Sequence, residues 1–385
     1  MTPQTVVVVG SGAAGALTAN LLARRLTPEQ AHIVVVDATG LHIFQPGLLN
    51  LALGRTRSPR LVRDVRRLLN DRIDLIVDRA RLLDPVAGTL HLERDGPLGY
   101  DFLVLAPGAR LDREAVPGSA AAHDFYSIVG AERLREALRH FESGTVVVGI
   151  GGTPYKCPPA PIEFSLLLEE RLRRRNLRAG TELHFLSPLG RLCPADGVSE
   201  LATPFFERRG IATHTFANIE QIDPGDRVIH TLEGESFPFD LAVLVPAHRG
   251  SALVEDSGIG DDGGWVPTDP ATLRVKGYER LFAVGDATDL SISKAGSAAH
   301  FEAPVVVEQI AAAVQGRAPD PVRIRYEGTV ICFLGVGGRR ATRLVFDYQG
   351  LRPIRRPSWR WQAARWAFKQ AYWRGFPQGR FIRSR

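Results

Sequence analysis

The sequence predicts an α/β protein with two parallel sheets, and two observations support this. First, the valine-rich segments 6–9 and 145–148 are typical of strands that are buried on both faces of a sheet. Second, each segment is followed by a turn and then by a stretch that is long enough for a helix. Because a strand, a turn and a helix follow one another twice, we expect two Rossmann-like dinucleotide-binding domains.

The turn after the first strand has the spacing of a dinucleotide site. Glycines stand at the first, third and sixth positions of Gly10-Ser11-Gly12-Ala13-Ala14-Gly15. Those positions allow a tight turn, the approach of backbone to a pyrophosphate, and close packing of helix on strand. The next helix, expected to reach residue 25, would direct free N–H groups at the phosphates. We therefore assign Gly10, Gly12, Ala13, Ala14 and Gly15 to this site; a plain strand-to-helix turn is the alternative.

Other strand ends supply further candidates for the same site. Asp37 follows the predicted strand 33–36, about twenty residues after the glycines, where a carboxylate can bind ribose hydroxyls. The predicted strand near 100–105 ends in Ala106-Pro107-Gly108, and the strand 280–284 ends in Gly285-Asp286. Small residues at such ends let backbone approach a flat ligand, although an ordinary strand end is an equal alternative for the turn at 106–108.

Changes of composition near residues 117 and 265 predict the domain boundaries. We expect a first domain in two parts, 1–116 and 265–325. A second domain, 117–264, would interrupt it, and a C-terminal region, 326–385, would follow.

The second valine strand leads into a loop of a different kind. Instead of a glycine fingerprint, the segment 149–164 contains four prolines and Cys157. Proline lacks the N–H that a pyrophosphate needs, which argues against tight NAD(P)H binding there. The three cysteines, Cys157, Cys193 and Cys332, form neither a zinc spacing nor a secreted disulfide framework. No metal site is therefore expected, and any role of these thiols is redox or nucleophilic.

The charge of the chain is concentrated at one end. Residues 348–385 contain nine Arg, one Lys and no acid, so without these ten charges the formal +6 becomes −4 for the first 347 residues. A basic tail on an acidic body suggests an acidic target surface. No run of eighteen apolar residues and no secretory signal are visible, so we expect neither a membrane span nor export from the cytoplasm.

Tryptophans favour a membrane leaflet over nucleic acid as that surface. Four of the five tryptophans lie in the basic tail, and its aromatic residues form two nearly opposite stripes on a helical wheel: Trp359, Trp366 and Trp373, and Trp361, Phe368 and Tyr372. We expect one stripe to pack on the body and the other to enter the lipid interface, which makes the tail a membrane-associating segment. A helix that caps the fold or joins a homodimer is the alternative.

Four stretches together resemble the FAD-dependent pyridine nucleotide-disulfide oxidoreductase family, and within it the sulfide:quinone oxidoreductases. They are VVVVGSGAAG, YDFLVLAPGAR, TPYKCPPAPIEF and LFAVGDATDLSISKAG. The resemblance implies that FAD occupies the N-terminal site and that Asp286 reaches its ribityl chain. Because the loop after Asp37 has no cysteine, non-covalent FAD is expected.

The resemblance also implies the chemistry. Cys157 and Cys332 would meet at one face of the flavin, where sulfide or a related sulfur nucleophile attacks their bridge and the electrons pass to a quinone. Lys156 would favour a thiolate and Glu163 would move a proton. We expect Cys193 to be a passive buried residue.

Two further residues are candidates for the reaction site. Only four lysines occur among 48 basic residues, yet Lys156 lies in the cysteine loop and Lys294 shortly after Gly285-Asp286. Since an ammonium has an adjustable pKa, we expect Lys294 to stabilise charge on reduced flavin or on a quinone oxygen. His248, at a predicted strand end, would approach the ring; a satisfied loop residue is the alternative.

We therefore expect a peripheral enzyme at the cytoplasmic face of the cell membrane that oxidises sulfide. A type II NADH:quinone reductase is the first alternative, disfavoured by the proline-rich loop. A flavin-carrying electron-transfer subunit that docks on a protein partner is the second.

Overall fold

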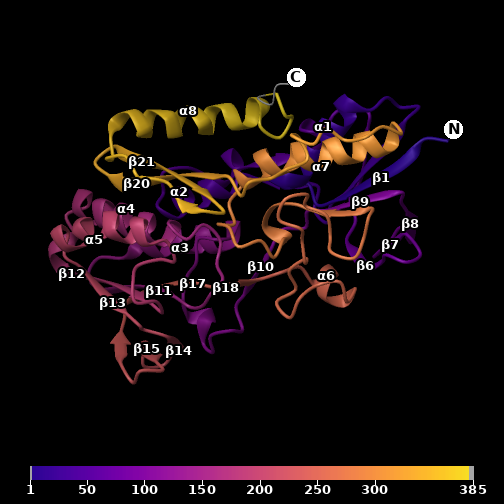
Figure 1. Cartoon of the computed structure of the whole chain (residues 1–385). Helices are drawn as coiled ribbons and strands as arrows, with labels where there is room; N and C mark the ends of the chain where they lie inside the picture. The colour runs from indigo at the N-terminus through magenta and orange to yellow at the C-terminus, as the bar shows by residue number, and fades with distance from the viewer. Residues whose placement is uncertain (1, 381–385) are drawn as a thin grey trace.

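A parallel five-stranded sheet forms one half of the computed structural model, which describes residues 2–380 (Figure 1). Its strand order is β19-β9-β1-β2-β5, and every neighbouring pair is parallel. The strands are β1 (Gln4–Val9), β2 (Ala31–Val36), β5 (Ile73–Ile76), β9 (Phe102–Leu105) and β19 (Leu281–Ala283). The α/β class is confirmed, and β19 joins this sheet from far along the chain.

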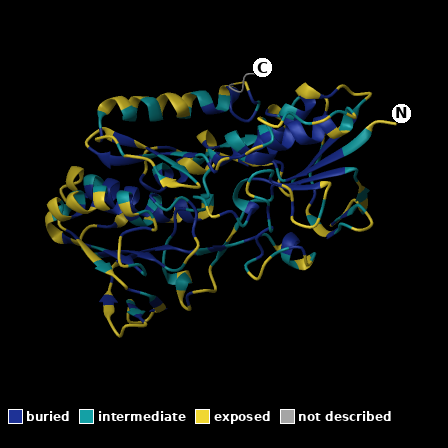
Figure 2. Cartoon of the chain, in the orientation of Figure 1, coloured by how far each residue is buried: buried dark blue, intermediate teal, exposed yellow. Residues whose placement is uncertain are grey.

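Helices cover this sheet because its strands are apolar on both faces. Val6, Val7 and Val8 are fully buried. The helices α1 (Ala13–Arg25) and α7 (Ala298–Val314) lie side by side, and their apolar residues share one core with β1 and β2. Figure 2 shows these strands and helices as mostly buried.

The second half contains a parallel sheet of order β13-β12-β11-β17. Its strands are β11 (Gly144–Ile150), β12 (Thr181–Ser187), β13 (Ile211–Thr215) and β17 (Leu241–Val245), and its helices are α3 (Ile128–His140), α4 (Ala160–Arg174) and α5 (Asp196–Arg208). The predicted valine strand lies within β11. The helix after the cysteine loop begins at Ala160, because Pro161 fits the first turn of a helix.

Small antiparallel sheets of two or three short strands complete both halves. They are β3 (Leu41–Ile43) with β4 (Val62–Asp64); β6 (Ala80–Asp84), β7 (Thr89–Leu92) and β8 (Pro97–Gly99); β14 (Ile219–Asp223), β15 (Val228–Thr231) and β16 (Ser236–Pro238). Of the two short helices, α2 (Leu48–Ala52) lies between β3 and β4 in the chain, and α6 (Ala252–Asp256) precedes β19. One pair, β10 (Arg110–Asp112) with β18 (Ala247–Arg249), joins segments that follow β9 and β17. The predicted domain boundaries stay a prediction.

The chain ends in an antiparallel sheet and a long helix. The sheet contains β20 (Val330–Gly337), β21 (Arg340–Asp347) and β22 (Gly350–Leu351), and α8 (Trp359–Gly375) follows it. Figure 1 shows α8 lying across β20 and β21 at one edge of the molecule. Within residues 2–380, no helix combines the length and apolar character that a bilayer span requires. The last five residues of the predicted tail, 381–385, lie outside the described part.

The two predicted aromatic stripes of α8 are only partly correct. Trp359 and Trp366 are 68% and 63% exposed, whereas Tyr372 is buried, as expected for opposite stripes. The prediction is wrong for Trp373, which is half-buried with the Arg63 guanidinium 4.9 Å from its ring centroid. A helical wheel treats the helix as uniform, but the C-terminal end of α8 packs more closely on the body than its beginning does.

Candidate functional site

The three glycines of the first turn have different environments. Gly10 has a φ of +89°, and a Cβ built on it would lie 2.3 Å from the Ala106 carbonyl oxygen. A Cβ on Gly15 would lie 1.8 Å from the carbonyl oxygen of Gly10, whereas a Cβ on Gly12 would meet no atom within 4 Å. Gly10 and Gly15 therefore serve chain packing, while Gly12 leaves open space at the N-terminus of α1, as a phosphate group requires.

The carboxyl ends of three strands meet at this turn. Ala106 donates its N–H to the Val9 carbonyl at 2.9 Å, and Val284 donates to Leu105 at 3.0 Å. Gly285, with a φ of +71°, lies so close that its Cβ would be 3.0 Å from the Ala14 methyl. A parallel sheet binds ligands at the carboxyl ends of its strands, so this edge fits a dinucleotide.

One predicted glycine, Gly108, and one that was not predicted, Gly296, lie near the same edge. Gly108, after the half-buried Pro107, has a φ of +74° and open space where a Cβ would be. A Cβ on Gly296 would lie 3.8 Å from the Ala13 methyl. The turns at 106–108 and 285–286 and the segment around residue 296 therefore come together around the N-terminus of α1.

The carboxylate of Asp37 accepts several hydrogen bonds from the protein itself. Its Oδ2 accepts from the N–H of Ser11 at 2.8 Å and from the Ser11 hydroxyl at 2.5 Å. Its Oδ1 accepts from the backbone N–H groups of Thr39 and Gly40 at 2.9 and 2.8 Å. Burial opposes ionisation, but these hydrogen bonds outweigh it and lower the pKa of Asp37. Asp37 therefore fixes the glycine turn, and its contact with a ribose stays a prediction.

Cys157 and Cys332 come together although they are far apart in sequence. Cys157 has a φ of +51° and donates its N–H to the Lys294 carbonyl at 3.0 Å, and Cys332 lies on the buried strand β20. Interaction with the neighbouring Cys332 thiol, and then burial, raises the pKa of Cys157 well above its usual value. Both residues are free thiols in the structure.

Glu163 lies beside this pair and is held from two sides. It is buried in the first turn of α4, where its Oε2 accepts the N–H of Gly335 at 3.2 Å. Its other oxygen forms an ion pair with Arg365 of α8. The two charges act oppositely on the thiol, because Glu163 raises the pKa of Cys157 and Arg365 lowers it.

Arg365 was not predicted as a site residue. It is one of nine arginines in the basic tail, and nothing in the sequence distinguishes it from the others. Only the packing of α8 on β20 and β21 brings its guanidinium to the buried Glu163 carboxylate and near the half-buried Cys157.

Replacing Arg365 by glutamine should make Cys157 less reactive at neutral pH. Loss of the cation raises the pKa of Cys157 further, so the fraction of Cys157 present as thiolate falls at a given pH. The rise of the alkylation rate with pH therefore moves to higher pH. We expect alkylation of Cys157 by iodoacetamide at pH 8 to slow severalfold, as followed by peptide mass. Arg365→Lys, which keeps the charge, should restore the wild-type pH profile; equal profiles for Arg365→Gln and wild type would refute the influence of this cation.

Lys156 connects the cysteine loop with the turn at Gly285-Asp286. Its side chain is buried, and its Nζ donates to Gln45 Oε1 at 2.9 Å and lies 3.6 Å from Asp286 Oδ2. The ammonium therefore points toward Asp286, while the Cys157 pKa responds to Glu163 and Arg365. This geometry differs from the expectation that Lys156 acts on the neighbouring thiol.

Lys294 is also held in place by neighbouring groups. Its Nζ donates to the carbonyl oxygens of Thr288 at 2.5 Å and Asp286 at 3.3 Å, and lies 3.8 Å from the ring centroid of Trp265. Burial lowers the pKa of Lys294, and nearby carboxylates, Asp286 first, oppose the shift. Both ammonium groups therefore contact the turn at Gly285-Asp286: Lys156 lies near the Asp286 carboxylate and Lys294 near its carbonyl oxygen.

His248 is a buried imidazole with one nitrogen unused by the protein. Its Nδ1 is 3.0 Å from the Pro246 carbonyl, which only accepts, so Nδ1 carries the hydrogen and Nε2 is an acceptor. Nε2 is buried without a hydrogen-bond partner among the described residues. Burial, and then the charge of Lys156, lowers the pKa of His248 to about 3. A buried acceptor without a partner is rare in proteins, so a ligand with a donor group fits this position.

Glu302 is a second residue that the prediction missed. It is fully buried in α7, and its Oε2 accepts the N–H of Gly285 at 2.6 Å. Burial raises the pKa of Glu302 to about 7. Glu302 and Glu308 are the two acids of the mostly apolar segment 298–314, so the sequence indicated buried carboxylates there but not which of them contacts the turn.

Cys193 is buried and contacts its own loop. Its thiol is 3.6 Å from the Ala195 carbonyl oxygen and 3.8 Å from the Ser199 hydroxyl. Burial raises the pKa of Cys193, and its passive role stays a prediction.

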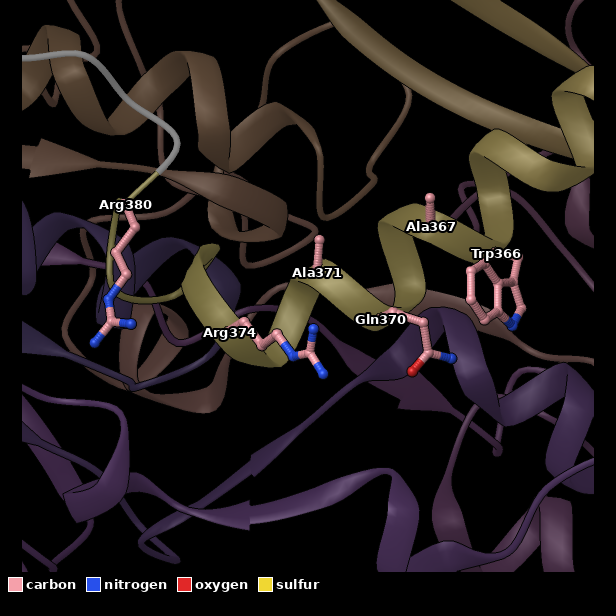
Figure 3. A pocket seen from close by; sticks show the side chains of 6 residues that line it. All are labelled: Trp366, Ala367, Gln370, Ala371, Arg374 and Arg380. Carbon is pink, nitrogen blue, oxygen red and sulfur yellow. The ribbon is translucent and has the colours of Figure 1, made fainter.

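The outward face of α8 carries a hollow of its own. Its lining residues are Trp366, Ala367, Gln370, Ala371, Arg374 and Arg380, and its volume is about 540 Å³. Figure 3 shows these side chains along α8 and the segment after it. An aromatic ring, small apolar residues and two cations therefore share one exposed surface.

Comparisons with known proteins point to redox enzymes of one architecture. Residues 4–315 match the family model described as pyridine nucleotide-disulphide oxidoreductase. The chain is similar to the mitochondrial sulfide:quinone oxidoreductase of Mus musculus, with 24% identity over 355 residues that cover 89% of this chain and 78% of the mouse protein. It is also similar to the alternative NAD(P)H-ubiquinone oxidoreductase C1 of Arabidopsis thaliana, with 27% identity over 376 residues that cover 85% and 70%.

A solved structure gives the same architecture over the whole chain. It is the X-ray structure of the sulfide:quinone oxidoreductase from Aquifex aeolicus, which superposes with a TM-score of 0.86 at 20% identity. The match covers 99% of this chain and 93% of that one, and it shows a shared fold.

Proposed function

Because the chain belongs to the pyridine nucleotide-disulphide oxidoreductase family, and is thus an oxidoreductase, we propose that it oxidises sulfide or a related sulfur nucleophile. The electrons pass through non-covalently bound FAD to a membrane quinone. The observation that carries this proposal is that Cys157 and Cys332 come together as free thiols, with Cys332 as the main influence on the raised pKa of Cys157.

FAD fits the edge where the first sheet ends. The pyrophosphate would lie over Gly12 at the N-terminus of α1, and the turns at 106–108 and 285–286 would follow the rest of the molecule. The free Nε2 of His248 would accept a hydrogen bond from the ligand. In this arrangement residues 1–116 and 265–325 form the FAD domain, 117–264 carries the cysteine loop, and 326–385 contributes Cys332 and the tail.

The thiol pair performs the sulfur chemistry. Hydrosulfide attacks a Cys157–Cys332 disulfide, so that one cysteine becomes a persulfide and the other leaves as a thiolate. A second hydrosulfide attacks the outer sulfur of the persulfide, the bond to the cysteine sulfur breaks, and the sulfur leaves as hydrodisulfide, HSS⁻, so that two cysteine thiols remain after the thiolate has taken a proton. Re-forming the disulfide releases two electrons and two protons. FAD, when bound, supplies the two-electron acceptor that communicates with the quinone.

The charged residues around the pair have separate roles. Arg365 favours the thiolate of Cys157, and Glu163, held by Arg365 and the N–H of Gly335, takes or returns a proton beside it. Lys294, whose pKa burial lowers, stabilises negative charge on reduced flavin or on a quinone oxygen. Lys156 orients Asp286 toward the ribityl chain.

An NADH:quinone reductase is the second candidate, because the Arabidopsis relative is named for NAD(P)H. The N-terminus of α4 argues against it. The N–H of Ala160 is already bonded to the Cys157 carbonyl at 2.7 Å, Pro161 has no N–H, and Glu163 adds a negative charge in the first turn. A second pyrophosphate would therefore find few donors and a repelling carboxylate.

Anaerobic titration of the FAD-loaded protein tests the proposal. Sodium sulfide should bleach the flavin absorbance without NADH, and a quinone analogue should restore it. Bleaching by NADH alone would favour the second candidate. If neither reductant bleaches the flavin, an electron-transfer subunit that takes electrons from a protein partner would be the better assignment.

We further propose that the enzyme binds peripherally to the cytoplasmic face of the cell membrane through the outward face of α8. Exposed Trp359 and Trp366 suit the lipid interface, and Arg374 and Arg380 beside the hollow suit anionic headgroups. Point variants test this better than removal of the tail, because α8 also carries Arg365 and the buried Tyr372.

The double variant Trp359→Ala/Trp366→Ala should reduce binding to anionic vesicles at least about tenfold, because two interfacial aromatic side chains are lost. Co-sedimentation with phosphatidylglycerol vesicles measures this, and the flavin content should stay unchanged. Trp265→Phe, at a buried tryptophan, is the matched control. Undiminished vesicle binding together with loss of a dimer would assign this face to a homodimer instead.

A further inference from the structure

The end of the tail is anchored on the helix that follows the glycine turn. Asn20 of α1 donates to the Pro377 carbonyl at 2.9 Å, and Arg24 donates to the Gly379 carbonyl at 3.0 Å. Gly379 lies so close that a Cβ on it would be 2.7 Å from the Leu21 side chain. The tail and α1 are therefore one packed unit, as their neighbouring positions in Figure 1 indicate.

A single imidazole joins the tail helix to the turn itself. His42 is fully buried; its Nδ1 is 2.8 Å from the Ser11 carbonyl oxygen, and its Nε2 is 2.8 Å from the Tyr372 hydroxyl. Because a carbonyl only accepts, Nδ1 donates to Ser11 and Nε2 accepts from Tyr372. Burial lowers the pKa of His42 and raises that of Tyr372, so both stay neutral in this arrangement at neutral pH.

Both ends of this link are fixed in place. Ser11, between the first two glycines, also donates its N–H and its hydroxyl to Asp37 at 2.8 and 2.5 Å. The Tyr372 ring packs against Phe44 and Phe376 with centroid distances of 4.5 and 5.1 Å. A displacement of α8 would therefore pull on the backbone next to Gly12.

We propose that His42 and Tyr372 are positioning residues that link the docking of α8 to the shape of the dinucleotide turn, so that FAD and the docked tail stabilise each other. This inference rests on the proposed FAD site but not on the proposed sulfur chemistry. This linkage is reciprocal. If docking of the tail increases the affinity for FAD by some factor, then bound FAD increases the equilibrium constant for docking of the tail by the same factor.

Tyr372→Phe tests the link because it removes only the hydroxyl and keeps the ring. The buried Nε2 of His42 then has no donor, and we expect the FAD Kd to rise about fivefold to thirtyfold. FAD titration of the apoprotein without membranes, followed by quenching of flavin fluorescence, measures this. Trp361→Phe, on the same helix beside Arg343, should leave the Kd unchanged. In a His42→Ala background, Tyr372→Phe should have no further effect.

Hydrogen exchange distinguishes a specific link between α8 and the FAD site from a general loss of packing in the Tyr372→Phe variant. In the wild type, FAD should slow amide exchange in peptides from 366–379, and Tyr372→Phe should lose most of this FAD-dependent slowing. An unchanged FAD Kd in Tyr372→Phe, or equal slowing by FAD in both proteins, would overturn the inference while leaving the proposed function intact. Wild-type protein that binds no FAD would contradict both.

Discussion

Replacing Cys157 by serine should slow sulfide-driven reduction of the flavin by about 10³-fold or more, because no disulfide then exists for sulfide to attack. Bound FAD should be retained, because serine keeps the size of the side chain and the groups that influence the Cys157 thiol are Cys332, Glu163 and Arg365, not residues of the glycine turn. Stopped-flow absorbance under anaerobic conditions measures the rate, and the flavin spectrum reports FAD content.

Two further variants make this result specific. Cys332→Ser should cause the same loss, because either partner alone cannot form the bridge. Cys193→Ser is the matched control, since its thiol contacts Ala195 and Ser199 of its own loop. Rapid sulfide-driven bleaching in both Cys157→Ser and Cys332→Ser would refute the thiol-pair mechanism.

Gly15→Ala should have the largest effect on stability. Alanine is ordinarily favoured over glycine inside a helix by about 1 kcal/mol. Here its Cβ would lie 1.8 Å from the Gly10 carbonyl oxygen, so backbone must move. We expect the free energy of unfolding to fall by about 3 kcal/mol or more, as measured by urea denaturation, with loss of bound FAD.

Gly12→Ala separates cofactor binding from packing at the same turn. No atom lies within 4 Å of the added methyl in the protein itself, so the apoprotein should keep its stability within about 0.5 kcal/mol. FAD affinity should nevertheless fall at least about tenfold, because the methyl occupies the space that a pyrophosphate needs. Unchanged FAD affinity in Gly12→Ala would contradict the proposed position of the phosphates.

The parts of the fold that follow from local patterns were predictable. The valine run at 6–9 lies in β1 and the run at 145–148 in β11, because strands covered on both faces leave an uninterrupted apolar signal. The turn at Gly285-Asp286 reaches the first glycine turn, because β19 is parallel to β9 in the same sheet. The two turns lie close together at that edge because the strands that precede them run in the same direction.

Contacts made by tertiary packing were not predictable in this way. Arg365 looks like any other tail arginine until α8 packs on β20, and the link from Tyr372 through His42 joins residues more than 300 positions apart. Glu302 is different in part, because an acid in a mostly apolar helix is visible in the sequence and signals a buried partner, although Glu308 of the same helix gives the same signal. Trp373 was grouped with the exposed Trp359 and Trp366, but it is half-buried. A helical wheel could not predict this, because it does not show which end of the helix packs more closely on the body.

The most direct test of the thiol-pair mechanism is to map the cysteine linkages of the FAD-loaded protein by mass spectrometry, before and after anaerobic addition of one equivalent of sulfide. The air-oxidised protein should yield a peptide in which Cys157 is joined to Cys332, directly or through added sulfur, with Cys193 free. Sulfide should open this linkage and leave extra sulfur on one of the two residues. If Cys157 and Cys332 are alkylated independently before and after sulfide while the flavin is still bleached, the two thiols are not the redox pair.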